Sequence, residues 1–145
     1  MRFVLDNSVA MRWLFGDGSL DDQMYAKQVL ASMTEATALV PSIWCLEVAN
    51  VIVRAEKKFG LMEARSTEFM RALQQMHIQI DPETSSHAMG DIVHIARRYN
   101  LSAYDAAYLE LALRESLPLA TLDDGLINAL KKAGAKQFTP YLLPQ

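Results

Sequence analysis

Four acidic residues carry the most chemical information in this sequence: Asp6, Glu47, Asp105 and Asp123. Asp6 directly follows the apolar run Phe3-Val4-Leu5, and Asp123 follows the short segment 119–121. Glu47 has apolar neighbours on both sides, which disfavours a simple solvated position. A buried carboxylate is costly unless it is paired or bound to a metal ion. The placement of these acids therefore calls for a chemical reason.

A simpler interpretation exists for three of the acids taken one at a time. Asp6 and Asp123 each precede an expected helix and could cap its first turn. Asp105 stands three residues after Ser102, which is the spacing of a capping box. For each acid alone, capping and a functional role both stay open.

Taken together, the acids favour metal chemistry. Carboxylates brought to one site repel each other, so folding would protonate some of them or recruit a cation. Carboxylates, hydroxyls and waters are the ligands that Mg²⁺ and Mn²⁺ prefer, and such ions bridge phosphate oxygens and activate water. Ser8 and Thr121 stand two residues from Asp6 and Asp123 and could orient these carboxylates or a metal-bound water. The spacing predicts a metal-dependent phosphoryl-transfer site without naming its substrate.

Hydrophobic patterning predicts the elements that must position these acids. Strands are expected at residues 2–5, 38–40, 77–81 and 118–122, with a final edge strand at 137–139. Helices are expected at 7–15, 21–36, 42–59, 62–76, 81–99, 102–116 and 124–133. Short strands alternating with helices predict an α/β fold with a parallel sheet covered on both faces. Ligands of such sheets bind beyond the carboxyl ends of the strands, where Asp6 and Asp123 are expected.

Length and composition indicate one globular domain. The chain has 145 residues, of which 51% are hydrophobic and 21% charged, so disordered and fibrous classes are excluded. Cys45 is the single cysteine, which fits a reducing compartment. No apolar run is long enough for a membrane span, and an early charge argues against a signal peptide. We expect a cytoplasmic protein.

The net charge decides little about nucleic-acid binding. A formal charge of −3 argues against a nonspecific nucleic-acid coat, which is strongly basic. However, five of the acids are site candidates when Asp124 is included, and the rest of the surface is slightly positive without them. A bound divalent ion would neutralise part of the remaining negative charge.

Four segments resemble, in order and spacing, the acid motifs of PIN-domain nucleases. Leu5-Asp6-Asn7-Ser8 is similar to the opening D-x-S, and Trp44-x-x-Glu47-Val48-Ala49-Asn50 is similar to the helical glutamate segment. Residues 101–108 (LSAYDAAY) and 119–123 (LATLD) are similar to the third and fourth acid motifs. The resemblance covers essentially the whole chain, and its length is most similar to the VapC toxins of toxin–antitoxin pairs.

The resemblance implies a PIN-like three-layer α/β/α fold over residues 1–145, with a short, mostly parallel central sheet flanked by helices. It implies an endoribonuclease that cleaves single-stranded or loop RNA with Mg²⁺ or Mn²⁺ and leaves 5′-phosphate and 3′-hydroxyl ends. It also implies a homodimer neutralised by a VapB-type antitoxin, with helices 7–15 and 62–76 contributing to those contacts. The implied metal-holding acids are Asp6, Glu47, Asp105 and Asp123, and the implied supporting polar groups are Ser8, Asn50 and Thr121.

Three further signals are weighed beside these motifs. Asp124 could add a ligand, but a favourable charge at a helix N-terminus is the preferred interpretation. Arg54 lies seven residues after Glu47, so it shares roughly the same helix face and could contact an RNA phosphate, or it could simply be solvated near the helix end. His87, Asp91 and His94 follow zinc-compatible helical spacing, but surface residues are the preferred interpretation.

Three other functions are alternatives. A housekeeping RNA-processing nuclease would have the same site without an antitoxin, and a neighbouring small reading frame for a DNA-binding antitoxin would separate the two. A receiver-like Mg²⁺-binding signalling module would need an acid pair after the first strand, where this chain has only Asp6. An inactive scaffold is disfavoured because no acid motif is missing.

Overall fold

The structure is a computed structural model that describes residues 1–140; residues 141–145 of the expected domain lie outside the described part. Its strands are β1 (Arg2–Leu5), β2 (Thr37–Val40), β3 (Ile78–Ile80) and β4 (Leu119–Ala120). Its helices are α1 (Asn7–Phe15), α2 (Leu20–Ser32), α3 (Ile43–Phe59), α4 (Glu63–Gln75), α5 (Thr84–His87), the π-helical turn η1 (Ala88–Ile92), α6 (Val93–Tyr99), α7 (Ala103–Glu115) and α8 (Asp124–Ala133).

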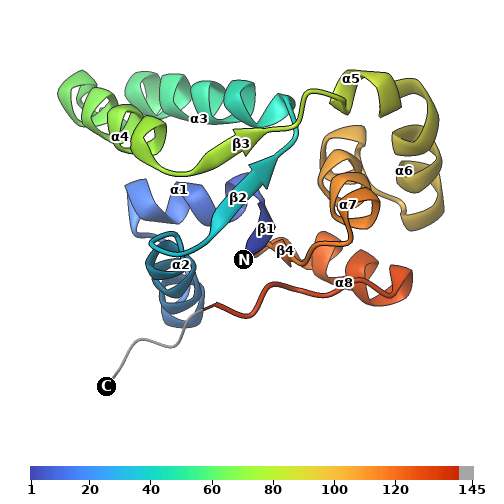
Figure 1. The fold of residues 1–145 in the computed structure, drawn as a ribbon. Helices are drawn as coiled ribbons and strands as arrows, with labels where there is room; N and C mark the ends of the chain where they lie inside the picture. Colours follow the sequence, from blue (N-terminus) through green and yellow to red (C-terminus); the bar gives the residue numbers. More distant parts are fainter. Residues whose placement is uncertain (141–145) are drawn as a thin grey trace.

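The four strands form one parallel sheet in the order β3-β2-β1-β4. Val4 lies opposite Leu39 on one side and Leu119 on the other, which makes β1 a central strand. Strands buried on both faces are apolar without alternation, and Phe3, Val4 and Leu5 are fully buried. In Figure 1, α1, α2 and α4 lie to the left of the strands, α3 runs above them, and α5 to α8 lie to the right. The predicted α/β fold with a flanked parallel sheet is confirmed.

The direction of chain travel reverses beside β1. From β1 the chain adds β2 and then β3 on one side, and it returns through α5 to α7 to place β4 on the other side. The carboxyl ends of β1 and β4 therefore flank a switch point, which is where ligands of open α/β sheets bind. Asp6 follows β1 and Thr121 follows β4 at this point.

The last described segment is tied to the outer edge of β4. Leu119 forms an isolated parallel bridge with Gln137, and the ring of Phe138 stacks on Phe3 with centroids 4.1 Å apart. The Tyr25 hydroxyl donates a hydrogen bond to the Phe138 carbonyl at 2.8 Å. The edge strand expected at 137–139 is thus reduced to a single bridge, held by backbone hydrogen bonds of Leu119 with Lys136 and Phe138 and by the ring stack.

The long helix expected at 81–99 is wrong in its start and continuity. Asp81 and Pro82 form a turn instead of a helix entry, because the Asp81 carboxylate accepts bonds from Arg114, Thr84 and the Glu83 amide. The helical path then passes from α5 through the π-helical turn η1 into α6, with non-helical angles at Met89. Gly90, which lowers helix propensity, lies inside that turn.

Most other boundaries shift by only a few residues. The helix expected at 21–36 ends at Ser32, and the strand expected at 118–122 is reduced to two residues. The Ser102 and Asp123 side chains cap α7 and α8 by accepting bonds from the Asp105 and Leu126 amides. No helix within residues 1–140 is long and apolar enough to cross a membrane.

Candidate active site

Four elements bring the predicted acids to the carboxyl end of the sheet. Asp6 ends β1, Asp123 precedes α8, Asp105 lies in the first turn of α7 and Glu47 in the second turn of α3. The four acids share one region. The negative charge of Asp105 raises the pKa values of Asp6 and Glu47, and that of Asp123 raises the pKa values of Asp6 and Asp105. We call these four residues the acid site.

Asp6 is the buried centre of the acid site and is 5% exposed. Its Oδ2 accepts hydrogen bonds from the Ser8 hydroxyl at 2.6 Å and from the Thr121 hydroxyl at 2.8 Å. Its side chain makes no capping bond to α1, so the capping interpretation of Asp6 is wrong. The two hydroxyls hold the carboxylate in place from both sides of the switch point.

The same hydroxyls also fix the loop between β4 and α8. The Leu122 amide donates to the Ser8 Oγ at 3.0 Å, and the Asp123 amide donates to the Thr121 Oγ1 at 3.0 Å. Asp123 caps α8 through its Oδ2, which accepts from the Leu126 amide at 2.8 Å. The capping role of Asp123 is therefore confirmed, and no hydrogen bond is recorded for its Oδ1 within residues 1–140.

Glu47 is positioned by a tyrosine from the opposite helix. The Tyr108 hydroxyl donates to the Glu47 Oε1 at 2.6 Å, and Tyr108 itself is fully buried on α7. Burial and the surrounding carboxylates raise the pKa of the Tyr108 phenol, so it stays protonated and remains a donor. Tyr108 was missed in the sequence because a tyrosine at a core position is normally assigned to packing.

Burial, with a smaller contribution from neighbouring charges, raises the pKa values of three carboxyls in the acid site. Burial raises the pKa of the Asp6 carboxyl from 3.8 to about 6; the charges of Asp105 and Asp123 add to the rise, whereas the bonds from Ser8 and Thr121 oppose it. Burial also raises the pKa of Glu47, with contributions from the charges of Asp6 and Asp105. Burial and the charge of Asp123 raise the pKa of Asp105.

Within the described residues, no positive side chain pairs with the acid site. Among the ion pairs of residues 1–140, none involves a member of the acid site. The positive N-terminal ends of α1, α7 and α8 lie next to Asp6, Asp105 and Asp123 and compensate part of the charge. Hard carboxylate and hydroxyl oxygens without a counter-charge are a donor set that fits a divalent cation.

Comparison with known proteins identifies the family. The PIN domain family model matches residues 3–132 of the chain. The chain belongs to the PIN domain family. Among curated proteins, none matches the chain.

Three solved structures share the fold of this PIN domain. PAE2754 from Pyrobaculum aerophilum is 20% identical with a TM-score of 0.64, covering 94% of this chain and 92% of that one. VapBC2 from Rickettsia felis, bound to a DNA fragment from their promoter, is 12% identical with a TM-score of 0.65 and coverages of 95% and 98%. FitAcB from Neisseria gonorrhoeae is 19% identical with a TM-score of 0.61 and coverages of 99% and 100%.

The remaining sequence candidates in this PIN domain occupy different places. Ser8 and Thr121 belong to the acid site through their bonds to Asp6, whereas Asn50 is exposed on α3. Asp124 is exposed in the first turn of α8, which agrees with a charge at a helix N-terminus. Arg54 is exposed and lines a groove with Phe15, Asp17, Val51, Ala55 and Phe59, none of which belongs to the acid site.

A second charged group of this PIN domain lies further along α7. His87, Asp91 and Glu110 place ligand atoms within 4.8 Å of one another and could hold a metal ion; no other such group of three occurs in the described residues. His94, which the sequence pattern suggested, is replaced by Glu110. Glu110 is also paired with Arg114, whose guanidinium donates to both of its carboxylate oxygens.

Arg114 makes this second group a charge-paired cluster. Arg114 also donates to both oxygens of Asp81, at 2.6 Å to Oδ2 and 3.2 Å to Oδ1. Burial acts to raise the pKa of Asp81, but the bonds from Arg114 and Thr84 outweigh it and lower this pKa below its ordinary value. We call Asp81, His87, Asp91, Glu110 and Arg114 the paired cluster.

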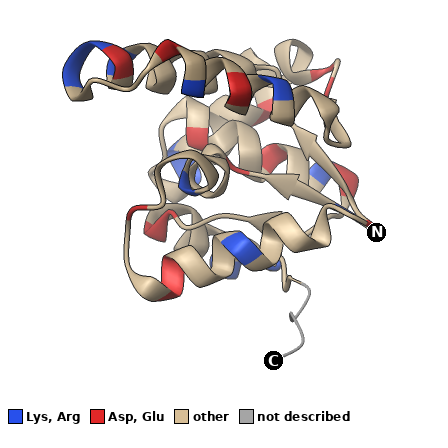
Figure 2. Cartoon of the chain, turned by 90° about the vertical axis from the view of Figure 1, so that its left-hand side faces the viewer, with Lys and Arg blue, Asp and Glu red and all other residues tan. Residues whose placement is uncertain are grey.

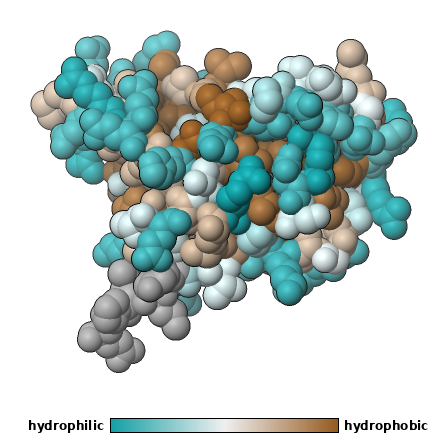
Figure 3. Space-filling view, viewed as in Figure 1, coloured by the Kyte–Doolittle hydropathy of each residue, from teal (hydrophilic) through white to brown (hydrophobic). Residues whose placement is uncertain are grey.

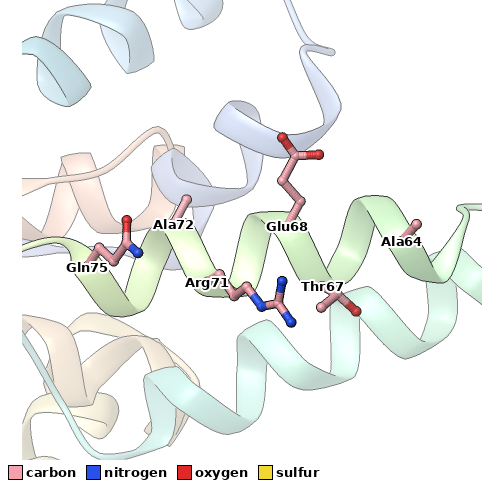
Figure 4. A pocket seen from close by; sticks show the side chains of 6 residues that line it. All are labelled: Ala64, Thr67, Glu68, Arg71, Ala72 and Gln75. Atoms are coloured by element: carbon pink, nitrogen blue, oxygen red, sulfur yellow. The ribbon is translucent and has the colours of Figure 1, made fainter.

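Surface grooves of this PIN domain lie away from both acid groups. Figure 4 shows one along α4, lined by Ala64, Thr67, Glu68, Arg71, Ala72 and Gln75. A second groove of about 600 Å³ runs between α1 and α4 and is lined in part by Trp13, Leu14, Met62 and Phe69. On the face seen in Figure 3, apolar side chains reach the surface between polar ones.

Proposed function

We propose that this protein is a metal-dependent endoribonuclease that cleaves single-stranded or loop RNA. The observation that supports this proposal best is the acid site: four carboxylates from four elements lie near enough for their charges to raise one another's pKa values, and within residues 1–140 none of them forms an ion pair. Membership of the PIN domain family and the shared fold of the VapBC2 structure support this function.

The residues of the acid site and the hydroxyls that orient them would have different roles in this reaction. Asp6, Asp105 and Asp123 would hold Mg²⁺ or Mn²⁺ directly or through water, and Glu47 would complete the negative site. Ser8 and Thr121 keep Asp6 in one orientation, and Tyr108 does the same for Glu47. When bound, the ion supplies charge neutralisation at the phosphate and lowers the pKa of the attacking water. Hydrolysis would leave 5′-phosphate and 3′-hydroxyl ends.

The test is cleavage of a total-RNA pool by the purified protein. Mg²⁺ or Mn²⁺ should produce discrete cuts that EDTA abolishes and that Asp6→Asn does not make. Asp91→Asn is the matched control, because it makes the same chemical change at an exposed carboxylate of the paired cluster. Equal cleavage by Asp6→Asn and the native protein would refute the proposal, and so would cleavage that persists in EDTA.

We also propose that the nuclease is the toxin of a type II toxin–antitoxin pair and forms a homodimer. Support comes from the VapBC2 and FitAcB structures, which share this fold, and from the apolar groove between α1 and α4. The exposed Met62, 72% accessible, is an apolar contact available to a VapB-type antitoxin in that groove.

Growth and mass measurements test the toxin proposal. Expression of the native chain should arrest growth, Asp6→Asn should not, and co-expression of the adjacent small reading frame should restore growth. Met62→Asp should weaken this rescue while RNA cleavage persists. Normal growth on expression of active nuclease would favour a housekeeping RNA-processing enzyme. Light scattering of the purified protein would refute the homodimer if it gave the monomer mass at micromolar concentration.

A further inference from the structure

Tyr104 is an exposed aromatic side chain without a specific partner. It is 62% exposed in the first turn of α7. The other tyrosines within residues 1–140 all have contacts: Tyr25 and Tyr108 donate hydrogen bonds through their hydroxyls, and Tyr99 lies beneath Arg98. No hydrogen bond, ring contact or ionic contact is recorded for the Tyr104 side chain in this part of the chain. Its ring is therefore available to a ligand.

Helix geometry places Tyr104 at the rim of the acid site. Tyr104 and Tyr108 are four residues apart and share one face of α7, and helical side chains lean toward the helix N-terminus. The Tyr108 hydroxyl, which reaches Glu47, is therefore carried toward the turn that bears Tyr104. Asp105, the next residue, belongs to the acid site. Tyr104 thus lies in the turn of α7 that bears Asp105, on the helix face whose Tyr108 hydroxyl reaches Glu47.

A second apolar side chain stands at the corresponding place on α3. Leu46 immediately precedes Glu47 and is 68% exposed, just as Tyr104 immediately precedes Asp105. Each helix that supplies an acid therefore also presents a large apolar residue to solvent beside it. Isolated exposed apolar residues are common, but here each of the two precedes a helix-borne acid in the sequence, and we call Leu46 and Tyr104 the apolar rim.

The charge distribution of the protein indicates that RNA affinity must come from contacts other than charge. The protein has a formal charge of −3, so general attraction to phosphates is weak. Figure 2 shows Lys and Arg interspersed with Asp and Glu along the helices on one side of the molecule, and no single basic face there. A nuclease of this kind needs affinity from another source, and stacking of a base on an aromatic ring provides it independently of charge.

We propose that Tyr104 is a stacking platform for a nucleobase of single-stranded RNA, the base of a nucleotide next to the phosphate held at the acid site. This inference rests on the proposed nuclease function. A base in a duplex has both faces covered by its neighbours, so the platform selects unpaired nucleotides. It recognises the flat face that all bases share, so the preference it gives is for single strands over duplexes, with little preference for sequence.

Steady-state cleavage of a short unstructured RNA tests this platform. Tyr104→Ala should lower kcat/KM about tenfold, the size expected for losing one base–aromatic stack. Tyr104→Phe and Tyr104→Trp should keep kcat/KM within about twofold, because the hydroxyl has no assigned role. Leu113→Ala is the matched control, since it truncates another exposed apolar residue of α7. Its kcat/KM should equal the native value.

Fluorescence gives a direct readout of stacking. A 2-aminopurine beside the cleavage site should be quenched when the native protein binds the RNA, and Tyr104→Ala should lose that quenching while its Mn²⁺ affinity stays native. If the native protein cleaves the RNA and Tyr104→Ala has the same kcat/KM and the same quenching, the stacking platform is wrong and the nuclease proposal is unaffected. Absence of cleavage by the native protein would instead overturn the nuclease and, with it, the platform. If Tyr104→Ala cleaves normally but binds the antitoxin more weakly, Tyr104 is a protein contact and the platform is wrong.

Discussion

The acid site and the paired cluster use similar residues in opposite ways. Both lie on α7, which supplies Asp105 to the first and Glu110 to the second, and both contain buried carboxylates. In the paired cluster, one guanidinium binds Asp81 and Glu110 together, and the pKa of Asp81 falls below its ordinary value. In the acid site, no Lys, Arg or His of residues 1–140 pairs with a carboxylate, and burial with neighbouring charges raises the pKa of Asp6 to about 6.

The difference separates structural from functional acids. A buried carboxylate that finds its counter-charge within the chain contributes to holding elements together, here α7 against the end of β3. A group of carboxylates left without one destabilises the empty fold and is retained only if a ligand uses it. Charge pairing, more than acidity, therefore distinguishes the two clusters.

The largest expected effect is the loss of catalysis at the acid site. Asp6→Asn should lower RNA cleavage by about a thousandfold or more, because removing a metal-holding carboxylate removes several kcal/mol of transition-state stabilisation. End-labelled RNA cleavage in Mn²⁺ measures it, with Asp91→Asn as control. A reduction of less than tenfold would mean that Asp6 does not hold the catalytic ion.

Arg114→Met should mainly lower the stability of the fold. Removing the guanidinium leaves the carboxylates of Asp81 and Glu110 buried without a cation, which costs about 3–5 kcal/mol. Urea denaturation measures this loss, and cleavage per folded molecule should change little. If the triple variant with Asp81→Asn and Glu110→Gln is no more stable than Arg114→Met alone, unpaired charge is not the cause.

The two clusters should also respond oppositely to pH. Asp6 has a folded pKa of about 6 against an ordinary 3.8, so between these values the folded protein binds more protons than the unfolded chain. Stability of the metal-free protein should therefore rise as pH falls from 7 toward 4, by about 2 kcal/mol. Asp81 has a lowered pKa, so its contribution is complete above 3.8 and is lost only as pH falls below that value.

Denaturation at pH 7 and at pH 5 in EDTA checks this sign. The gain in stability at pH 5 should be smaller in Asp6→Asn, which should also be more stable than the native protein at pH 7. Equal pH dependence in the two proteins would show that Asp6 does not carry the repulsion of the acid site.

The smallest predicted effect concerns Tyr108. Tyr108→Phe removes the hydroxyl that orients Glu47 and should lower Mn²⁺ affinity about tenfold, as expected for a group that positions a metal-holding residue. Calorimetric titration with Mn²⁺ measures this change. Tyr25→Phe, which removes a partly buried tyrosine hydroxyl that donates to the Phe138 carbonyl, is the matched control and should keep native affinity. Unchanged affinity in Tyr108→Phe would limit Tyr108 to packing.

The sequence predicts the acid site better than it predicts the paired cluster. Asp6 and Asp123 follow apolar segments that are expected to be strands of a parallel sheet, so strand patterning alone predicts that they lie at the same edge. Arg114 and Asp81 are 33 residues apart, and nothing local in either segment indicates that they meet. The Tyr108 bond was missed for a related reason: a helical pattern indicates which face is buried but not which polar atom its side chain reaches.

Local competition explains the failures around η1. The pattern at 81–99 is helical throughout, but the side-chain bonds of Asp81 stabilise a turn, and the π-helical turn around Gly90 changes which residues share a face. His87 and Asp91 therefore stay together, whereas the third member is Glu110 from α7 and not His94. Tertiary contacts decide such sets, and a single-helix repeat cannot reveal them.

Calorimetric titration with Mn²⁺ shows directly whether the acid site or the paired cluster binds the ion. The native protein would be compared with two variants. Asp105→Asn replaces a carboxylate of the acid site by an amide, and Asp91→Asn makes the same change in the paired cluster. If the acid site holds the metal ion, Asp105→Asn abolishes or severely weakens Mn²⁺ binding, and Asp91→Asn binds Mn²⁺ as the native protein does. Loss of Mn²⁺ binding in Asp91→Asn, with native binding in Asp105→Asn, would place the metal ion in the paired cluster and show that the acid site does not hold it.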